Sequence, residues 1–159
     1  MKPLTILIAE DDTGHFTLVR KNIKRISADT EVVRFLNGKE LLDYFFDDHG
    51  SLNHGRNGRY LLLLDIKMPM VDGVTALEKL KSDPELKKMT VFMLTTTNNP
   101  DEINHCYQLG CNFYIVKPSD YMEFMQTIEH LGEFLLIPGL AIPEIDPAHI
   151  SNLNYTGHN

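Results

Sequence analysis

The chain has 159 residues, of which 43% are hydrophobic and 23% charged, a composition typical of a globular domain. Its formal net charge of −7 argues against non-specific nucleic-acid binding, which requires clustered Lys and Arg. No apolar stretch approaches the roughly 20 residues of a membrane span, and the first apolar run is too short for a signal peptide. We therefore expect one cytoplasmic domain, over residues 1–136, that binds neither nucleic acid nor a membrane.

Apolar runs of strand length alternate with segments in which apolar residues recur at helical spacing. In chain order, we expect strand 5–9, helix 14–27, strand 31–35, helix 39–48, strand 60–64, helix 73–82, strand 90–94, helix 101–109, strand 112–116 and helix 121–136. This alternation predicts right-handed crossovers and a parallel, doubly wound sheet. Asp101 is expected to cap the fourth helix, Gly110 to end it, and Ser119 or Asp120 to cap the last helix.

Asp65 directly follows the apolar run 61–64, which predicts a strand buried on both faces. A lone carboxylate inside such a sheet is costly, so we place Asp65 at the carboxyl end of the strand, where open α/β sheets bind ligands. The first, third, fourth and fifth strands end at this same edge. The polar residues expected to converge there are Glu10, Asp11, Asp65, Thr95 and Lys117.

The carboxylates of Glu10, Asp11 and Asp65 repel one another unless they share a cation, and Mg²⁺ prefers such oxygen ligands. With Mg²⁺ bound, Asp65 can attack phosphorus as a nucleophile and form an acyl phosphate. Lys117 supplies a positive charge, and Thr95 a hydroxyl, to the phosphoryl oxygens. Each residue alone has an ordinary explanation as a cap, a turn or solvated surface. Their joint occurrence at the ends of the expected strands favours the chemical interpretation.

Four segments that carry these residues, 6–12, 63–73, 93–96 and 114–118, resemble the motifs of a receiver domain of bacterial two-component response regulators. The resemblance covers about residues 1–135. It implies a flavodoxin-like fold, with a five-stranded parallel sheet flanked by five helices. It also implies transfer of a phosphoryl group from a histidine kinase to Asp65. Such a domain catalyses its own phosphorylation and dephosphorylation, and we do not expect another enzymatic activity.

The resemblance also assigns the metal ligands by position. Asp11 matches the direct Mg²⁺ ligand, and Glu10 matches the ligand that acts through water. The backbone carbonyl of Lys67 matches the third protein ligand, beside Asp65. The peptide between Lys117 and Pro118 is expected to be cis.

Thr95 and Tyr114 match the switch pair of the family. A phosphoryl group draws the Thr95 hydroxyl towards it and vacates space, which the Tyr114 ring can fill by rotating inward. This movement reshapes the face formed by helix 101–109, strand 112–116 and helix 121–136. The alternative is that Tyr114 is simply a half-buried aromatic residue of a strand.

Residues 137–159 form a proline-containing C-terminal extension, which is too short for a DNA-binding or enzymatic output domain. We therefore expect the output to be a protein contact. The helix at 121–136 has more apolar residues than one buried stripe uses. Two explanations stay open, and both can hold. The tail folds back over this helix, or helix 101–109, strand 112–116 and helix 121–136 form a homodimer interface that the tail extends. The loop before residue 60 and the tail are similar to those of single-domain regulators paired with bacterial phytochrome kinases, which implies a bacteriophytochrome partner.

Two alternative functions remain. A Mg²⁺-dependent phosphohydrolase usually needs a second carboxylate two residues after the nucleophile, but Lys67 stands at that position. A binding module that works without phosphorylation is disfavoured because every part for phosphoryl transfer is present. The two cysteines, Cys106 and Cys111, match no common zinc spacing, and we expect them to be reduced structural thiols.

Overall fold

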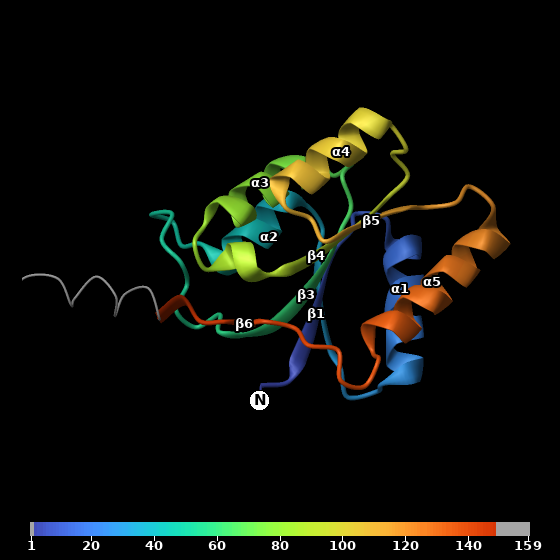
Figure 1. Cartoon of the computed structure of the whole chain (residues 1–159), viewed down its shortest axis with the longest axis horizontal. Helices are drawn as coiled ribbons and strands as arrows, with labels where there is room; N and C mark the ends of the chain where they lie inside the picture. The colour runs from blue at the N-terminus through green and yellow to red at the C-terminus, as the bar shows by residue number, and fades with distance from the viewer. Residues whose placement is uncertain (1, 149–159) are drawn as a thin grey trace, which may run out of the picture.

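The computed structural model describes residues 2–148, which form a parallel sheet with helices on both faces (Figure 1). The strands are β1 (Leu4–Ala9), β2 (Glu31–Phe35), β3 (Gly58–Leu64), β4 (Thr90–Thr95), β5 (Phe113–Val116) and β6 (Glu144–Ile145). The helices are α1 (Thr13–Ile26), α2 (Gly38–Phe45), α3 (Gly73–Ser82), the 3-10 turn η1 (Leu86–Lys88), α4 (Pro100–Leu109) and α5 (Tyr121–Leu135). Within the described residues, no helix is both long enough and apolar enough to cross a membrane.

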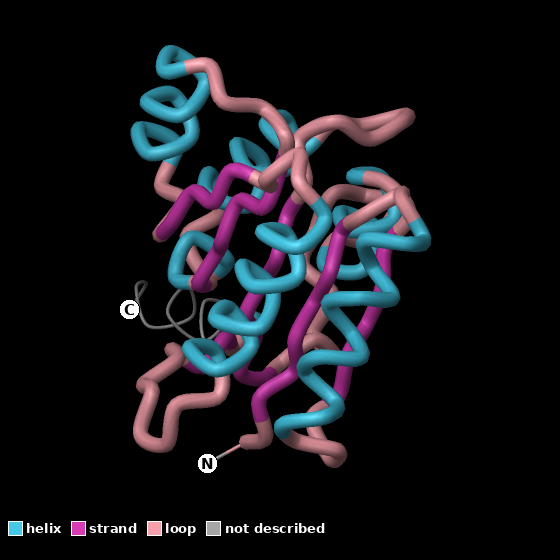
Figure 2. The backbone as a smooth tube through the Cα atoms, turned by 90° about the vertical axis from the view of Figure 1, so that its right-hand side faces the viewer, coloured by secondary structure: helices cyan, strands magenta, loops and turns pink. Residues whose placement is uncertain are grey.

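The first five strands pair in parallel in the order β2-β1-β3-β4-β5. Helices α1 and α5 lie together on one face of the sheet, and α2, α3 and α4 cover the other (Figure 1). Figure 2 views the α1 and α5 layer from outside, with the strands behind it. The flavodoxin-like, doubly wound five-stranded sheet flanked by five helices is therefore confirmed. The winding reverses between β1 and β3, which opens a crevice at their carboxyl ends.

Successive side chains of the central strands point to opposite faces, and both faces are buried. In β1, Ile6 and Ile8 pack against α1 and α5, whereas Leu7 and Ala9 pack against the α2, α3 and α4 layer. The leucines at 61–64 alternate in the same way, and each is at most 1% exposed. The prediction that this run is buried on both faces is confirmed.

Helix α2 ends three residues earlier than the sequence pattern predicts, at Phe45 instead of position 48. The cause is Asp47, whose Oδ1 accepts hydrogen bonds from the backbone N–H groups of His49 and Ser51, each at 2.9 Å. These bonds offer the backbone a turn in place of another helical residue.

Helix α4 begins at Pro100, and its N-cap is Asn99 rather than the predicted Asp101. The Asn99 Oδ1 accepts a hydrogen bond from the Asp101 N–H at 2.9 Å. Proline suits the first helical position because its missing N–H has no partner there, so the helix begins earlier. The other two cap predictions are confirmed: Gly110 ends α4 with a φ of 107°, and Asp120 caps α5.

The tail after α5 folds back across the amino end of the sheet, where β6 pairs antiparallel with β3 (Figure 1). The Arg59 Nε donates to the Ile142 carbonyl at 3.2 Å, and the Asp146 N–H donates to Glu85 Oε1 at 2.8 Å. Ile145 is fully buried between these contacts. Folding back of the tail, one of the two explanations for the apolar excess of α5, is thus observed. The rest of the predicted extension, residues 149–159, lies outside the described residues.

The tail covers only the carboxyl end of α5, where Leu136 and Leu140 pack against the core. Other apolar side chains near this helix stay exposed. Tyr121 is 62% exposed, Phe113 on the neighbouring β5 is 50% exposed, and Phe134 is 37% exposed. The tail therefore explains only part of the apolar excess.

Candidate functional site

Five predicted site residues meet at one edge of the sheet. They are Glu10 and Asp11 after β1, Asp65 after β3, Thr95 at the end of β4 and Lys117 after β5. These parallel strands all end at the same edge, so the topology brings four separate segments of the chain into one pocket. No single element supplies more than two of these side chains.

The backbone around Asp65 is held from both sides. The Asp65 N–H donates to the Ala9 carbonyl at 3.1 Å, and the Ile66 N–H donates to Asp65 Oδ1 at 2.8 Å. The Gly73 N–H donates to the Ile66 carbonyl at 2.8 Å, and any side chain at Gly73 would collide with the Asp65 carbonyl. The loop after β3 therefore closes tightly behind the carboxylate, which is 9% exposed and directed into the pocket.

Glu10, Asp11 and Asp65 each offer a carboxylate oxygen, and these oxygens lie within 4.8 Å of one another. Glu10 is 4% exposed, and its Oε2 is buried with no hydrogen-bond partner among the described residues. Asp11, the third member of this group, is exposed. A hard divalent cation prefers this kind of oxygen donor set and keeps waters at its open positions. The residues present therefore fit Mg²⁺ or Mn²⁺.

The Lys117 ammonium lies at the centre of the pocket, and its side chain is 3% exposed. Its Nζ is 2.6 Å from Glu10 Oε1, 3.4 Å from Asp65 Oδ2 and 3.1 Å from the His15 Nδ1. The Lys117 N–H also donates to the Thr95 carbonyl at 2.7 Å, which anchors the backbone after β5. The ammonium is therefore within a small movement of any group attached to Asp65 Oδ2.

Two buried carboxylates face one buried ammonium, so the charges of the pocket do not balance. Burial and the nearby Asp65 carboxylate raise the pKa of Glu10 to about 8, although Lys117 opposes the shift. Burial also acts to raise the pKa of Asp65, but contact with Glu10 and the charge of Lys117 lower it below its usual value. Asp65 is thus the ionised partner, and the excess charge falls on Glu10. A bound divalent cation balances that charge in place of a proton.

Thr95 is fully buried, and its Oγ1 has no hydrogen-bond partner among the described residues. A buried hydroxyl without a partner costs about 1–3 kcal/mol, so its presence at the pocket needs a reason. A phosphoryl oxygen on Asp65 is an acceptor that this hydroxyl can use. The Thr97 Oγ1, two residues later, also has no hydrogen-bond partner among the described residues.

Tyr114 is half-buried and packs against the core beneath α4. Its hydroxyl donates to the Thr97 carbonyl at 2.7 Å, and its N–H donates to the Tyr107 Oη at 3.0 Å. Burial raises the pKa of Tyr114 to about 12, so the hydroxyl stays protonated at neutral pH. The ring therefore joins β5 to the loop that follows Thr95.

Two other expectations concern the backbone. Lys67 lies in the loop after Asp65, its side chain is exposed, and no protein donor in residues 2–148 reaches its carbonyl. The carbonyl is thus free to accept a ligand. The expected cis peptide between Lys117 and Pro118 is wrong, because all described peptide bonds are trans. Lys117 reaches the carboxylates of Glu10 and Asp65 with a trans peptide bond before Pro118, the isomer that such bonds ordinarily favour.

Two further residues contact the site and were missed from the sequence. The His15 Nδ1 is 3.0 Å from Glu10 Oε1, and the Arg34 guanidinium donates to the carbonyls of Glu10 and Asp11. The position of His15 in the first turn of α1, four residues after Asp11, was a usable signal. Nothing in the pattern of β2 indicates that Arg34 reaches beyond the end of its strand.

Cys106 and Cys111 are both free and buried, as expected. Burial raises the pKa of each thiol to about 11, which keeps both protonated and unreactive at neutral pH. Neither residue lies in the pocket around Asp65.

The response regulator receiver domain family matches residues 6–129, which is most of the chain. The chain belongs to this family. The site residues Glu10, Asp11, Asp65, Thr95 and Lys117 all fall within the matched segment.

Three solved structures show how far the similarity extends. A response regulator receiver domain from Rhodospirillum rubrum is 38% identical, with a TM-score of 0.81, over 89% of this chain and 99% of that chain. The phosphorylated cyanobacterial phytochrome response regulator RcpA is 30% identical, with a TM-score of 0.73, over 87% of this chain and 97% of that one. The Mn²⁺-bound form of the response regulator Rcp1, a protein of Synechocystis sp., is 26% identical, with a TM-score of 0.76, over 89% and 99%.

Proposed function

We propose that this protein accepts a phosphoryl group on Asp65 from a histidine kinase and signals through the face formed by α4, β5 and α5. The observation that carries the proposal is the environment of Asp65 Oδ2. The buried Lys117 ammonium is 3.4 Å away, and two more carboxylates complete a cation site. The Thr95 hydroxyl, which has no partner within residues 2–148, ends the adjacent strand. Membership of the receiver family supports phosphoacceptor signalling of this kind, in a domain that is normally not an enzyme in its own right.

The transfer follows from these contacts. Asp65 Oδ2 attacks the phosphorus of a phosphohistidine, and the new O–P bond forms as the N–P bond breaks. The imidazole leaves with the bonding electrons and takes a proton from solvent. Lys117 moves from Glu10 towards the incoming phosphoryl oxygens, and Thr95 Oγ1 donates to one of them. Asp11, Asp65 and the Lys67 carbonyl would hold Mg²⁺, with Glu10 acting through water, and the bound ion would neutralise charge on the phosphoryl group.

Acetyl phosphate, a small phosphodonor, tests the proposal without a known kinase. We expect wild type to gain one phosphoryl group in the presence of Mg²⁺, seen as slower migration in a phosphate-affinity gel. Asp65→Asn should gain none. Asp72→Asn is the matched control, because it removes a carboxylate from the same loop while Asn still caps α3. Phosphorylation of Asp65→Asn at the wild-type rate would contradict the proposal.

The signal leaves through Thr95 and Tyr114. A phosphoryl group on Asp65 draws the Thr95 hydroxyl and shifts the loop that carries Thr97. The Tyr114 hydroxyl bonds to the Thr97 carbonyl, so a shift of that loop changes the position of β5 and the start of α4. Thr95→Ala should accept phosphate but lose most of the phosphorylation-dependent response in NMR shifts of α4 and β5. An unchanged response in that variant would disprove this coupling.

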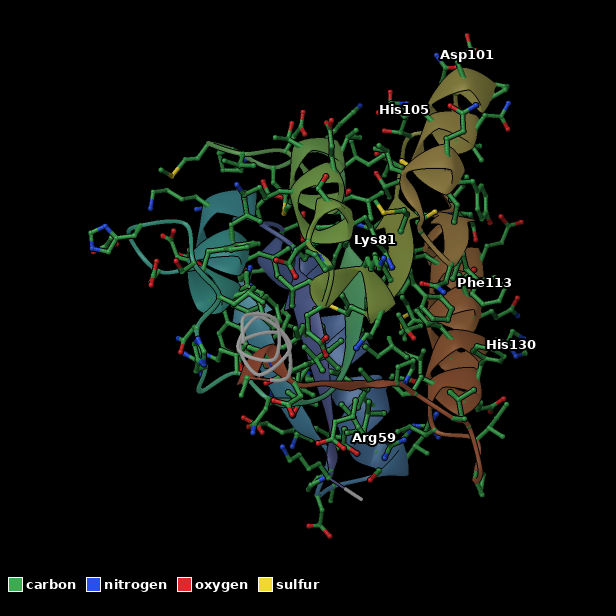
Figure 3. All side chains as sticks on the ribbon, turned by 60° about the vertical axis from the view of Figure 1, so that its left-hand side comes forward. Arg59, Lys81, Asp101, His105, Phe113 and His130 are labelled. Carbon is green, nitrogen blue, oxygen red and sulfur yellow. The ribbon has the colours of Figure 1, made fainter. Side chains whose placement is uncertain are left out.

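The surface that carries the signal is an aromatic groove formed by Phe92 of β4, Phe113 of β5 and Phe134 of α5. The rings of Phe92 and Phe113 stack with centroids 5.0 Å apart, and Phe134 packs edge-on against both. The groove encloses about 430 Å³, and its lining includes Phe113 and His130, which are labelled in Figure 3. Because β5 is an edge strand on which Phe113 and Val116 are exposed, this face favours association. The occupant we assign to it is a second copy of this chain, in a homodimer.

Light scattering tests the dimer. Wild type should have the mass of a dimer, and Phe113→Glu should be a monomer. Leu36→Glu, which places the same charge on an exposed apolar residue of the β2–α2 loop, should leave the dimer intact. A monomeric wild type, both with and without beryllofluoride, would remove the homodimer from the account.

The histidine kinase partner is, in this proposal, a bacteriophytochrome. The support is the similarity to RcpA, which is itself a phytochrome response regulator. Transfer from a panel of phosphorylated histidine kinases tests the assignment. Preferred transfer from a phytochrome kinase supports it, and preferred transfer from a kinase of another class contradicts it.

A further inference from the structure

Arg34 lies near the end of β2 and reaches beyond the sheet to the loop between β1 and α1. Its Nε donates to the Glu10 carbonyl at 3.2 Å, and its Nη2 donates to the Asp11 carbonyl at 3.2 Å. The same Nη2 is 3.2 Å from the Thr13 hydroxyl, in the first turn of α1. One guanidinium therefore bonds three successive parts of the segment that carries the two acidic residues of the site.

The guanidinium is itself fixed in place. It lies over the ring of Phe16 in α1, with its central carbon 4.6 Å from the ring centroid. On the other side of the strand end, the Glu10 N–H donates to the Phe35 carbonyl at 3.0 Å. Glu10 is thus held at its N–H by the backbone of β2 and at its carbonyl by the side chain of Arg34. A rigid, planar fork of this kind sets direction as well as distance.

We propose that Arg34 is a positioning residue for divalent-cation binding, acting through the backbone of Glu10 and Asp11. The inference rests on the proposed function, since it concerns the same cation site. The carboxylates of Glu10 and Asp11 must converge with that of Asp65, which arrives on a different strand. Asp11 is exposed, so the fixed backbone of its loop, rather than packing of its side chain, sets where its carboxylate lies. Partners that orient metal ligands from behind commonly change metal affinity by about 10- to 100-fold when they are removed.

The positive charge of Arg34 acts in the opposite direction. A guanidinium near a cation site repels the cation, so loss of the charge alone would tighten binding. Replacement by Met retains an apolar stem over Phe16 and removes the charge, whereas replacement by Lys retains the charge and removes the fork. If the fork is what matters, both variants weaken binding. If the charge dominates, Arg34→Met tightens binding.

Arg56 provides a matched control elsewhere in the chain. Its Nε donates to the Tyr44 carbonyl at 3.1 Å, and its guanidinium lies 3.8 Å from the Tyr44 ring centroid. It therefore makes the same two types of contact as Arg34, but to the end of α2 instead of the acidic loop. Arg56→Met should cost stability without changing cation affinity.

The experiment is calorimetric titration of MgCl₂ into the full chain as wild type, Arg34→Met, Arg34→Lys and Arg56→Met, with urea unfolding of each. We expect both Arg34 variants to bind Mg²⁺ about tenfold more weakly, at the lower end of such effects because the ligands themselves remain. Raising Mg²⁺ to saturation should restore their rate of phosphorylation by acetyl phosphate, which a general loss of folded structure would not allow.

Wild-type affinity or tighter binding in Arg34→Met would overturn the inference, and Arg34→Lys decides if the Met variant does not fold. If wild type binds Mg²⁺ and is phosphorylated, and the Arg34 variants do the same equally well, the role of Arg34 is refuted but the proposed function is not. A wild type that binds no Mg²⁺ would refute the proposed function as well.

Discussion

Replacing Glu10 by Gln should stabilise the cation-free protein at alkaline pH. The folded-state pKa of Glu10 is about 8, raised from 4.5, so the folded protein holds this proton more tightly than the unfolded chain. Folding stability is therefore lost as the pH rises from about 4.5 to about 8, because the unfolded chain releases this proton in that range while the folded protein keeps it. Gln keeps an oxygen that can accept from Lys117 but cannot ionise.

The difference between the two pKa values sets the size of the effect. At about 1.4 kcal/mol per pH unit, the full difference corresponds to a ceiling of about 5 kcal/mol. Movement of Lys117 and entry of water into the pocket both lower the cost of the charge. We therefore expect Glu10→Gln to exceed wild type by about 2 kcal/mol in free energy of unfolding at pH 9, and by nearly nothing at pH 5.

Urea unfolding followed by circular dichroism, in EDTA and at several pH values, measures this difference. Glu78→Gln is the control, because Glu78 is an exposed carboxylate on α3. Adding Mg²⁺ should stabilise wild type at pH 8 more than it stabilises Glu10→Gln, which keeps the direct ligands but lacks the charge of Glu10. A Glu10→Gln protein that is no more stable than wild type at pH 9, or equally stabilised at pH 5, would refute the electrostatic account of the pocket.

Three further substitutions test the supporting structure by urea unfolding. Gly73→Ala should lower the free energy of unfolding by at least about 2 kcal/mol and slow phosphorylation, since its Cβ displaces the Asp65 backbone. A stable, fully active variant would contradict the close contact between Gly73 and the Asp65 carbonyl. Glu85→Ala should lower the free energy of unfolding by about 1–3 kcal/mol, because the Asp146 N–H in the tail loses its acceptor, which Glu85→Gln retains. Equal losses in the two variants would exclude that hydrogen bond. Ile145→Ala should lower the free energy of unfolding by about 2–4 kcal/mol because Ile145 is buried, and the exposed Ile137→Ala should lower it by almost nothing. Similar losses in the two variants would show that β6 does not pack on the sheet.

The sheet and most of its site were predictable because they depend on local patterns. The buried run 61–64 requires a strand covered on both faces, and this requirement places Asp65 at the strand end. Alternation of strands and helices then brings Glu10, Thr95 and Lys117 to the same edge. These inferences use only burial, spacing and topology, all of which a single sequence carries.

The features that sequence analysis missed depend on how far side chains reach across the fold. Arg34 contacts the carbonyls of residues 10 and 11 from another strand, which no sequence spacing encodes, whereas the place of His15 in the first turn of α1 was a signal that could have been used. The end of α2 and the cap of α4 depend on which of several neighbouring polar side chains bonds to the backbone. Asp47 forms these hydrogen bonds after α2, and Asn99 forms the one at the start of α4. The pairing of β6 with β3 depends on the strand register, which the sequence pattern does not give. β4 first pairs with β3 at Leu61, so residues 58 and 59 pair with β6 instead.

The most direct test of the central claim is chemical identification of the phosphorylated residue. The protein is incubated with acetyl phosphate and Mg²⁺ and then treated with sodium borohydride, which reduces an acyl phosphate of Asp to homoserine. Peptide mass spectrometry should find homoserine at position 65, and only when Mg²⁺ is present. Homoserine at another carboxylate such as Asp11, or none at all from phosphorylated protein, would contradict the account.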